Sequence, residues 1–568
     1  MLKKAKNSKK FILGIAIIFL VIYIAINTYQ ILYSKKLKQN LKDITWVKKQ
    51  INISLNNDLG TNIYNVSNKK KISIYNQNYQ KAIDEKINEL LEDTYTINNP
   101  LIILNPYGTN NLGANIYFNS EEALEVSYTV SVSDKNITNF SRTLNNDAEN
   151  NYTTKHSYQI IGLVPEKLNT IKLIAKNKNN DETTYTFTIN MSNIKCESDT
   201  LLESVEGDSN QQLEDGLFVL FGLDKAFNAN NYLYDNNGII RADLVLHEYR
   251  SDRIIFYDDK LIYSYDTNKI AVINRLGKVE KEYTLKGYTM HHDYIFDEEN
   301  KKLLILANSN KESSTTIEDL IISLDLKTGK VQEIVDMKDL MPDIYNTAKM
   351  PESGKNTYGG TGLDWIHLNS LSLVNNNGDI VISSRELSTI IYLENIYKEP
   401  SIKYLIADPS VYKNTKYENL VLEKIGDFIN QAGQHTITYV KDDNLEDGQY
   451  YLEMYNNNYG ASNTREEFPW KNYTGVGTFS EGTASKYYQY LVDEKEKSYK
   501  LTKEFDVEYS SIVSSVQDLK NNHVTSSGKS NSYAEYDEEG SLIRQFNYTS
   551  KKYAYRVFKY NFENIWFK

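Results

Sequence analysis

The chain has 568 residues, with 64 lysines and arginines against 75 aspartates and glutamates, so its formal net charge is −11. This acidity argues against a nucleic-acid-binding protein, because such proteins carry a basic face that neutralises phosphates. Hydrophobic residues make up 40% of the chain, and its 46 tyrosines and only 8 prolines favour a buried core and long runs of strand.

The amino terminus has the pattern of a membrane anchor. Five lysines within residues 1–10 precede an apolar stretch at residues 11–33, which reaches the length of about twenty residues that a helix needs to cross a bilayer. No small-residue cleavage site follows, so an uncleaved anchor is favoured over a cleaved signal peptide. The five lysines outnumber the three that follow the stretch, which predicts a cytoplasmic amino terminus and an extracytoplasmic remainder.

Two segments are predicted between this anchor, which with its tail spans residues 1–34, and the rest of the chain. Residues 35–95 are polar and rich in lysine and asparagine, and we interpret them as a stalk with one helix near residues 79–91. Residues 96–198 contain short alternating runs bounded by Asn, Asp and Gly, which predict a small β-sandwich. This domain has no cluster of reactive side chains, and we expect it to be a structural support.

Residues 199–568 contain a loose repeat. Copies start near residues 254, 292, 367, 435 and 512, and each has about four predicted strands with a glycine turn near its end. This is the unit of a β-propeller blade, and copies of about 45–70 residues give about six blades in this length. The predicted fold is therefore all-β: a six-bladed β-propeller preceded by a small β-sandwich domain and an N-terminal transmembrane helix.

Three of the copies begin with a histidine, at His292, His367 and His435. The first strand of each blade lines the central channel, so these imidazoles are predicted to converge. Arg385 ends the next strand of its hairpin and should return beside His367. Asn369 lies two residues after His367 and should share its face of the strand.

The remaining histidines are treated separately. Alternation along the strand should turn His291 away from the channel when His292 points into it, yet His291 is kept as a candidate substrate-binding residue. His156, His247 and His523 have no equivalent position in the repeat, and we interpret them as ordinary core or surface residues.

A channel with a guanidinium, an amide and several imidazoles suits a tetrahedral oxyanion such as a sulfate or phosphate ester. One alternative is a metal-dependent hydrolase in which the three imidazoles and Asp293 bind zinc or iron. Arg385 counts against it, because a fixed cation repels a metal and attracts an anion. The other alternative is a non-catalytic surface module that binds glycans or cell-wall material through exposed tyrosines.

Four motifs resemble those of bacterial aryl-sulfate sulfotransferases, the group that works without the nucleotide sulfate donor. In chain order they are Met290-His-His-Asp-Tyr294, Asp364-Trp-Ile-His-Leu-Asn-Ser370, Ser383-Ser-Arg-Glu386 and Gly433-Gln-His-Thr436. The segment Asn99–Gly108 also resembles the start of that family's amino-terminal β-domain, and the likeness extends over about residues 95–568.

The resemblance implies a six-bladed propeller with a small β-sandwich, often paired as a homodimer. It implies a ping-pong reaction in which His435 accepts the sulfuryl group from a phenolic sulfate donor and passes it to a phenol acceptor. His292, His367, Asn369 and Arg385 would then hold the sulfuryl oxygens, and one histidine would protonate the departing phenolate. No cofactor and no metal are expected.

The sequence departs from this family in two ways. Periplasmic members carry a structural disulfide near the nucleophile, which the single cysteine, Cys196, cannot supply around residues 432–443. They usually have a cleaved signal where this chain keeps an apparent anchor, so we expect attachment to the outer face of a single-membrane cell.

Overall fold

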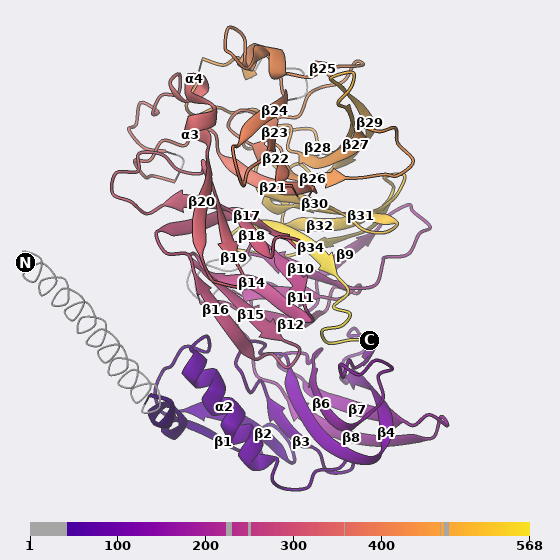
Figure 1. Cartoon of the computed structure of the whole chain (residues 1–568). Coiled ribbons are helices and arrows are strands. Elements are labelled where there is room, and N and C mark those ends of the chain that lie inside the picture. The colour runs from indigo at the N-terminus through magenta and orange to yellow at the C-terminus, as the bar shows by residue number, and fades with distance from the viewer. Residues whose placement is uncertain are drawn as a thin grey trace, which may run out of the picture.

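The structure is a computed structural model that describes residues 43–222, 230–247, 251–356, 358–375, 377–465, 467–470 and 476–568. Two β-rich domains follow one another along these residues (Figure 1). None of the helices in the described ranges is long and apolar enough to span a bilayer. The predicted anchor at residues 11–33 lies outside the described residues.

The amino-terminal domain is built around the long strand β4 (Ala114–Ser131). Its first half pairs with β3 and β6, and its second half pairs with β5 and β7, so that one strand belongs to both layers of the predicted sandwich. The other strands are β1 (Ile51–Leu55), β2 (Ile63–Asn68), β3 (Leu101–Leu104), β5 (Phe140–Thr143), β6 (Thr153–Ile160), β7 (Leu168–Lys176) and β8 (Glu182–Asn190). Buried residues alternate along the second half of β4 and along β7, as expected for strands that cover a core on one face.

The predicted stalk is not a stalk where the structure describes it. Strands β1 and β2 extend the sheet beyond β3, and helix α2 (Gln77–Leu90) packs its buried face on the same sheet. The Asn76 side chain accepts two backbone N–H groups and begins the helix. The helix expected near residues 79–91 is thus confirmed, but it belongs to the domain, because its apolar stripe needs a partner and the sheet supplies one.

The carboxyl-terminal domain is a propeller of six sheets, each with four antiparallel strands at its centre, and this confirms the all-β prediction (Figure 1). Blade 1 consists of β34 (Arg556–Tyr560), β10 (Leu217–Phe221), β11 (Asn230–Tyr234) and β12 (Ile240–Val245). Blade 2 consists of β13 (Ile254–Tyr257), β14 (Lys260–Asp266), β15 (Lys269–Asn274) and β16 (Val279–Thr284). Blade 3 consists of β17 (Tyr288–Asp297), β18 (Lys302–Ser309), β19 (Leu320–Asp325) and β20 (Val331–Asp336).

The other three blades follow in chain order. Blade 4 consists of β21 (Leu368–Asn375), β22 (Asp379–Ser384), β23 (Thr389–Glu394) and β24 (Ser401–Ile406). Blade 5 consists of β26 (His435–Val440), β27 (Gln449–Asn456), β28 (Ser485–Asp493) and β29 (Ser498–Val507), with β25 (Glu423–Lys424) added at its edge. Blade 6 consists of β30 (Ser514–Asp518), β31 (Asn522–Ser527), β32 (Ser532–Asp537) and β33 (Leu542–Asn547), with β9 (Glu203–Glu206) at its edge. Helices α3 (Met337–Leu340) and α4 (Pro342–Tyr345) lie between blades 3 and 4. The 3-10 turns η1 (Pro409–Val411) and η2 (Glu418–Leu420) lie between blades 4 and 5, and η4 (Gly528–Ser530) lies between β31 and β32.

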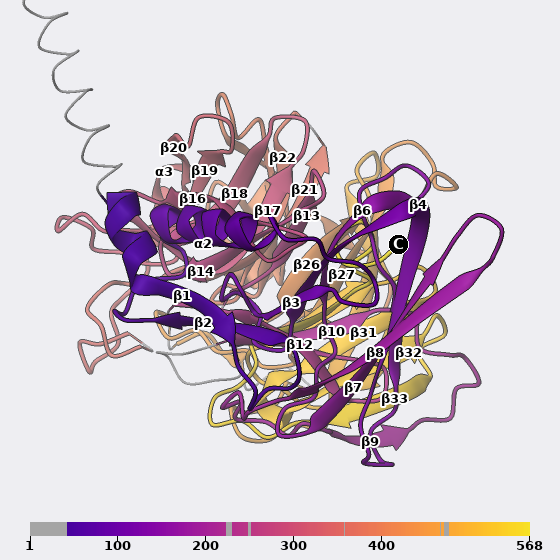
Figure 2. The ribbon, with the colours of Figure 1, turned by 90° about the horizontal axis from the view of Figure 1, so that it is seen from below.

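Both ends of the propeller sequence close the ring. Strand β34 comes from the carboxyl end of the chain and pairs with β10, while β9 comes from the start of the domain and pairs with β33. The last residues then return to the amino-terminal domain, where Lys568 N–H donates to the Thr143 carbonyl at 3.1 Å and Asn145 N–H donates to the Trp566 carbonyl at 3.0 Å. Figures 1 and 2 show the carboxyl terminus beside that domain. The two domains are therefore connected twice: by the chain that runs from one into the other, and by the hydrogen bonds of the carboxyl-terminal segment.

A buried network of charges lies where the first strands of the blades meet. The Asp293 carboxylate on β17 pairs with Arg556 of β34 at 2.6 Å and with Arg253, just before β13, at 3.1 Å. Asp293 and Arg556 are fully buried. Burial would raise the pKa of Asp293, but the two guanidinium groups hold it below its usual range. The network joins blades 1, 2 and 3.

We expect Asp293→Asn to destabilise the protein by about 3–5 kcal/mol, because two guanidinium groups then lose their buried counter-charge. Urea unfolding followed by tryptophan fluorescence measures the change. The control Asp443→Asn removes a surface carboxylate, 89% exposed, and should change stability by less than about 0.5 kcal/mol. Equal effects for the two variants would contradict the role of this network.

Candidate active site

The three predicted histidines lie on the first strands of blades 3, 4 and 5 or directly beside them: His292 lies within β17, His367 directly precedes β21, and His435 begins β26. The strand register shifts close to each histidine, between Met290 and Tyr294 in β17 and near the starts of the other two strands. His292 and His367 have left-handed backbone, with φ of 57° and 49°. Bulges of this kind re-aim side chains at the rims of sheets. Simple alternation along the strand therefore does not apply here.

The bulge corrects our expectation for His291. Instead of pointing away from its neighbour, its imidazole meets that of His292, with the two Nδ1 atoms 2.9 Å apart. Both rings are buried, and burial lowers the pKa of His291. His291 therefore supports His292 from within the same cluster.

Four aromatic rings connect the three blades. The ring centroids of His292 and His367 are 4.8 Å apart. Tyr555, directly before the closing strand β34, lies 5.3 Å from His292 and 6.2 Å from His435. The histidines from blades 3, 4 and 5 thus converge, as the repeat predicts.

Arg385 and Asn369 join the cluster through the hairpin of blade 4. Arg385 N–H donates to the His367 carbonyl at 3.0 Å, as the antiparallel pairing predicts, and its guanidinium lies 3.9 Å from Asp364. The Asn369 amide donates to the Gln434 carbonyl at 2.8 Å, next to His435. Its Oδ1 is buried without a hydrogen-bond partner among the described residues. An acceptor left in this way is available to a bound molecule.

His367 lies between two carboxylates. Its Nδ1 is 2.6 Å from Glu318 and 2.7 Å from Asp364. Burial and the Arg385 guanidinium lower the pKa of His367, but Asp364 and Glu318 outweigh them and raise it to about 9. The opposite ring atom, Nε2, is buried and has no hydrogen-bond partner in the described part of the chain. At neutral pH this ring is an imidazolium.

His435 has neutral partners instead. Its Nδ1 lies 2.8 Å from Asn457 Oδ1 and 3.0 Å from the Gly433 carbonyl, and both are acceptors. The orientation of the Asn457 amide is fixed because its nitrogen donates to the Ser510 carbonyl at 2.6 Å and to Ser514 Oγ at 3.0 Å. This network assigns the proton to Nδ1 of His435 and leaves the lone pair on Nε2. Burial lowers the pKa of His435 to about 3, so the ring is neutral.

Two glutamines fix the segment that carries His435. The Gln431 side chain donates to the carbonyls of Ser388 and Ile406, each at 3.0 Å. The Gln434 side chain donates to Ser383 Oγ at 2.9 Å and to the carbonyls of Ser384 and Thr389. These contacts fix the loop to blade 4, at a place where no disulfide can form because Cys196 is the only cysteine.

Among the residues that the structure describes, two sets of three side chains have donor atoms within 4.8 Å of one another, close enough to hold a metal ion: His291, His292 and Glu318, and Glu318, Asp364 and His367. Hydrogen bonds and ion pairs among these side chains explain the short distances without a metal ion. Asp293, which the metal alternative required, is paired with Arg253 and Arg556 instead. Arg385 beside the cluster disfavours a divalent cation and favours an anion.

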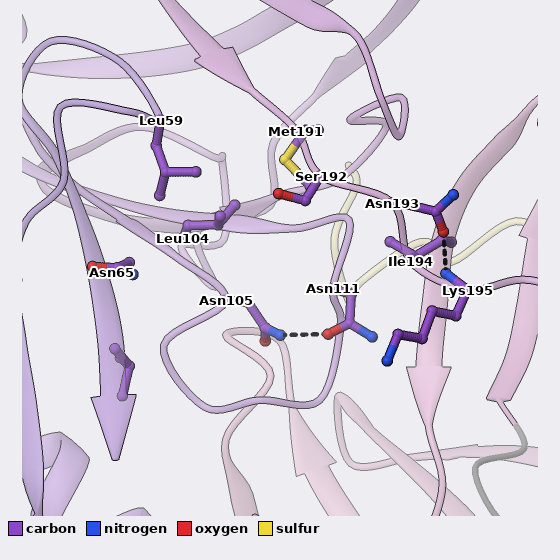
Figure 3. A pocket seen from close by; sticks show the side chains of 11 residues that line it. Leu59, Asn65, Leu104, Asn105, Asn111, Met191, Ser192, Asn193, Ile194 and Lys195 are labelled. Carbon is purple, nitrogen blue, oxygen red and sulfur yellow. Dashed lines mark hydrogen bonds between the residues drawn. The ribbon is translucent and has the colours of Figure 1, made fainter. Parts of the chain in front are cut away.

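Other candidate features lie away from this cluster. A cavity of about 390 Å³ is lined by amino-terminal-domain residues and by the segment that leads into the propeller, including Asn105, Asn111 and Lys195 (Figure 3). None of its described lining residues is a histidine, arginine or carboxylate.

The histidines that have no equivalent position in the repeat have structural partners. His156 bonds to Ser120 and Tyr158, and His523 bonds to Asp518.

Several residues of the site were not predicted as site residues. Glu318, Asn457, Tyr555 and Arg556 lie far from the motifs in sequence, and Asp364 lies within one of them but was not singled out. Arg556 occupies the start of a blade's first strand, as the histidines do. The repeat could have revealed it only if blade 1 had been recognised as split between the two ends of the domain.

Comparison with known families agrees with this geometry. The model of the family described as Arylsulfotransferase (ASST) matches residues 202–564, and that of the Arylsulfotransferase Ig-like domain matches residues 101–192. No curated protein sequence matches the chain.

Solved structures with a related outline include an auxiliary nutrient binding protein from Bacteroides thetaiotaomicron, with 9% identity over 80% of this chain and 92% of that chain and a TM-score of 0.31. Another is BamB from Moraxella catarrhalis, with 9% identity over 65% of this chain and 97% of that chain and a TM-score of 0.28. Likeness at this level supports no further conclusion.

We expect Asn457→Asp to raise the pKa of His435 by about one to three units, because a carboxylate beside Nδ1 stabilises the imidazolium. Histidine-selective NMR titration measures it. The control Asn444→Asp places the same charge on an exposed loop of blade 5 and should leave His435 unchanged. An unchanged pKa in Asn457→Asp would show that Asn457 does not contact Nδ1.

Proposed function

The chain belongs to the arylsulfotransferase family and is an aryl-sulfate sulfotransferase, and from this premise we propose that His435 carries the sulfuryl group in a ping-pong reaction. The donor is a phenolic sulfate ester and the acceptor a phenol. The observation that supports this role is the pairing of His435 Nδ1 with two acceptors, which leaves a lone pair on Nε2. A neutral, buried imidazole with a fixed tautomer is a ready nucleophile at neutral pH.

The reaction has two halves. In the first, His435 Nε2 attacks the sulfur of the donor, the N–S bond forms, the S–O bond to the aryl group breaks, and the phenolate oxygen takes up a proton. In the second, the oxygen of the acceptor phenol attacks the same sulfur, the N–S bond breaks, and the acceptor's proton passes to the base left by the first half. Atoms and charges balance over the two halves.

The neighbouring side chains suit the charge that the sulfuryl group carries. Arg385 offers a fork of donors, and the Asn369 amide and the imidazole of His292 lie at the same cluster. Fixed donors at a dry site stabilise charge that develops in the transition state. Because the chain is an enzyme of this family, the alternative of a non-catalytic surface module is set aside.

Brief exposure to an aryl sulfate without acceptor should add one sulfuryl group to His435, which peptide mass spectrometry detects, and added phenol should remove it. His435→Gln should abolish the adduct and lower turnover by at least about 10³-fold, the range seen when a nucleophile is lost. His523→Gln, which alters a buried histidine outside the cluster, should leave both unchanged. An adduct that forms in His435→Gln would place the nucleophile elsewhere.

We also propose that residues 11–33 anchor the enzyme in the cell membrane, with the propeller on the extracytoplasmic side. The support is the apolar sequence and its flanking lysines. The homodimer implied by the family resemblance stays a prediction.

The full chain should remain in the membrane pellet after carbonate extraction, and protease added to intact spheroplasts should digest the propeller. Leu20→Arg with Val21→Arg should release the protein from the pellet, because each arginine costs about 2.5–3.5 kcal/mol at the centre of a spanning helix. Lys3→Arg with Lys4→Arg keeps the flanking charge and is the control. Wild-type protein in the soluble fraction would contradict the anchor.

A further inference from the structure

We infer that Glu318, together with Asp364, is a positioning residue that holds His367 as an imidazolium whose Nε2–H protonates the oxygen of the departing phenolate. This inference rests on the proposed function and extends it by assigning the proton donor and the residues behind it. Neither carboxylate was expected at the site from the repeat.

Glu318 is fixed in place from two directions. It lies between β18 and β19 of blade 3, in left-handed backbone with φ of 60°. Its N–H donates to Asn308 Oδ1 at 2.5 Å, and its carbonyl accepts from Leu368 N–H of blade 4 at 2.9 Å. The second contact ties it to the residue that follows His367. Its carboxylate is therefore held 2.6 Å from His367 Nδ1 by backbone on both sides.

The charges around His367 balance only when it is protonated. The charged and titratable groups nearest to it are Glu318, Asp364, Arg385, His292 and Tyr358, whose ring lies 6.2 Å from that of His367. His291 and His435 also interact with it, and burial lowers the pKa of both. Two carboxylates and one guanidinium would leave a net negative charge in a buried site that binds an anion. One imidazolium cancels it, and a buried charge without a partner is costly.

The direction of the proton follows from the ring. Nδ1–H donates to Asp364, and the Glu318 carboxylate lies 2.6 Å from the same nitrogen. The second proton of the imidazolium is therefore on Nε2, which is buried without a hydrogen-bond partner among the described residues. As the S–O bond breaks, this proton passes to the phenolate oxygen, and His367 becomes neutral. It accepts the proton of the acceptor phenol in the second half-reaction and is restored. The carboxylates remain charged throughout.

His367 and the phenol that exchanges a proton with it have similar pKa values. Asp364 and Glu318 raise the pKa of His367 to about 9 against burial and Arg385, and a phenol has a pKa of about 10. Proton transfer in both directions is then close to balanced, which is the condition for efficient general acid and base catalysis. The group is protonated below about pH 9, so its contribution is lost as pH rises through that value.

Glu318→Gln tests this role because it removes the charge but keeps the shape. We compare single-turnover rates for phenyl sulfate, a poor leaving group that needs a proton, and nitrophenyl sulfate, a good one that does not. The variant should lose about 10²-fold or more with phenyl sulfate and less than about tenfold with nitrophenyl sulfate. The alkaline limb of the phenyl sulfate rate should move to lower pH.

One control and one parallel variant make the outcome decisive. Glu312→Gln, on an exposed loop before Glu318, should leave both rates unchanged. Asp364→Asn removes the second carboxylate and should give the same dependence on the leaving group, which preserves the test if one variant fails to fold. Equal losses with both donors, or no loss, would overturn the inference. The donor comparison reports on S–O cleavage whichever residue accepts the sulfuryl group, so it is independent of the adduct test on His435.

Discussion

The buried pairing of Asp293 with Arg556 is the contact on which the site depends. Arg556 arrives on β34 from the carboxyl end of the chain, and only this strand completes blade 1. The same guanidinium donates to the Asn369 carbonyl of blade 4 at 3.1 Å. Blades 3, 4 and 5 can bring their histidines to one axis because the ring is closed opposite them. Removing one partner of a buried ion pair costs about 3–5 kcal/mol because the other charge is left without a counter-charge, so the site depends on both residues.

His367 and His435 show how one residue type serves two roles. Each ring has its Nδ1 turned toward oxygen acceptors, so that Nε2 is the ring nitrogen on the opposite side. The acceptors of His367 are carboxylates, whereas those of His435 are an amide and a backbone carbonyl. The first ring is therefore charged and the second neutral, with pKa values raised to about 9 and lowered to about 3. Environments that separate the pKa values of two like groups define an acid and a nucleophile.

Much of this arrangement could be predicted from the sequence. The strands repeat along the sequence and carry histidines at equivalent positions. This pattern alone predicted the propeller, the convergence of His292, His367 and His435, and the return of Arg385 beside His367.

Glu318 and Asn457 could not be found in this way, because each lies in a loop outside the repeat and reaches the site only through the fold. His291 was misplaced because alternation assumes a regular strand, and the bulge at φ 57° is set by local packing. The first strands of the amino-terminal domain were missed because their apolar residues are few and separated by asparagine.

The absence of a disulfide near His435 has a structural counterpart. The buried side-chain amides of Gln431 and Gln434 direct their four N–H bonds at five acceptors of blade 4. Each such bond contributes about 0.5–1.5 kcal/mol, so the set is of the same order as the roughly 2–4 kcal/mol of a disulfide. These bonds act on the folded state, whereas a disulfide acts mainly by restricting the unfolded chain. His435 is thus held by contacts that need no oxidant, and its geometry is independent of the redox state of the compartment in which the protein folds.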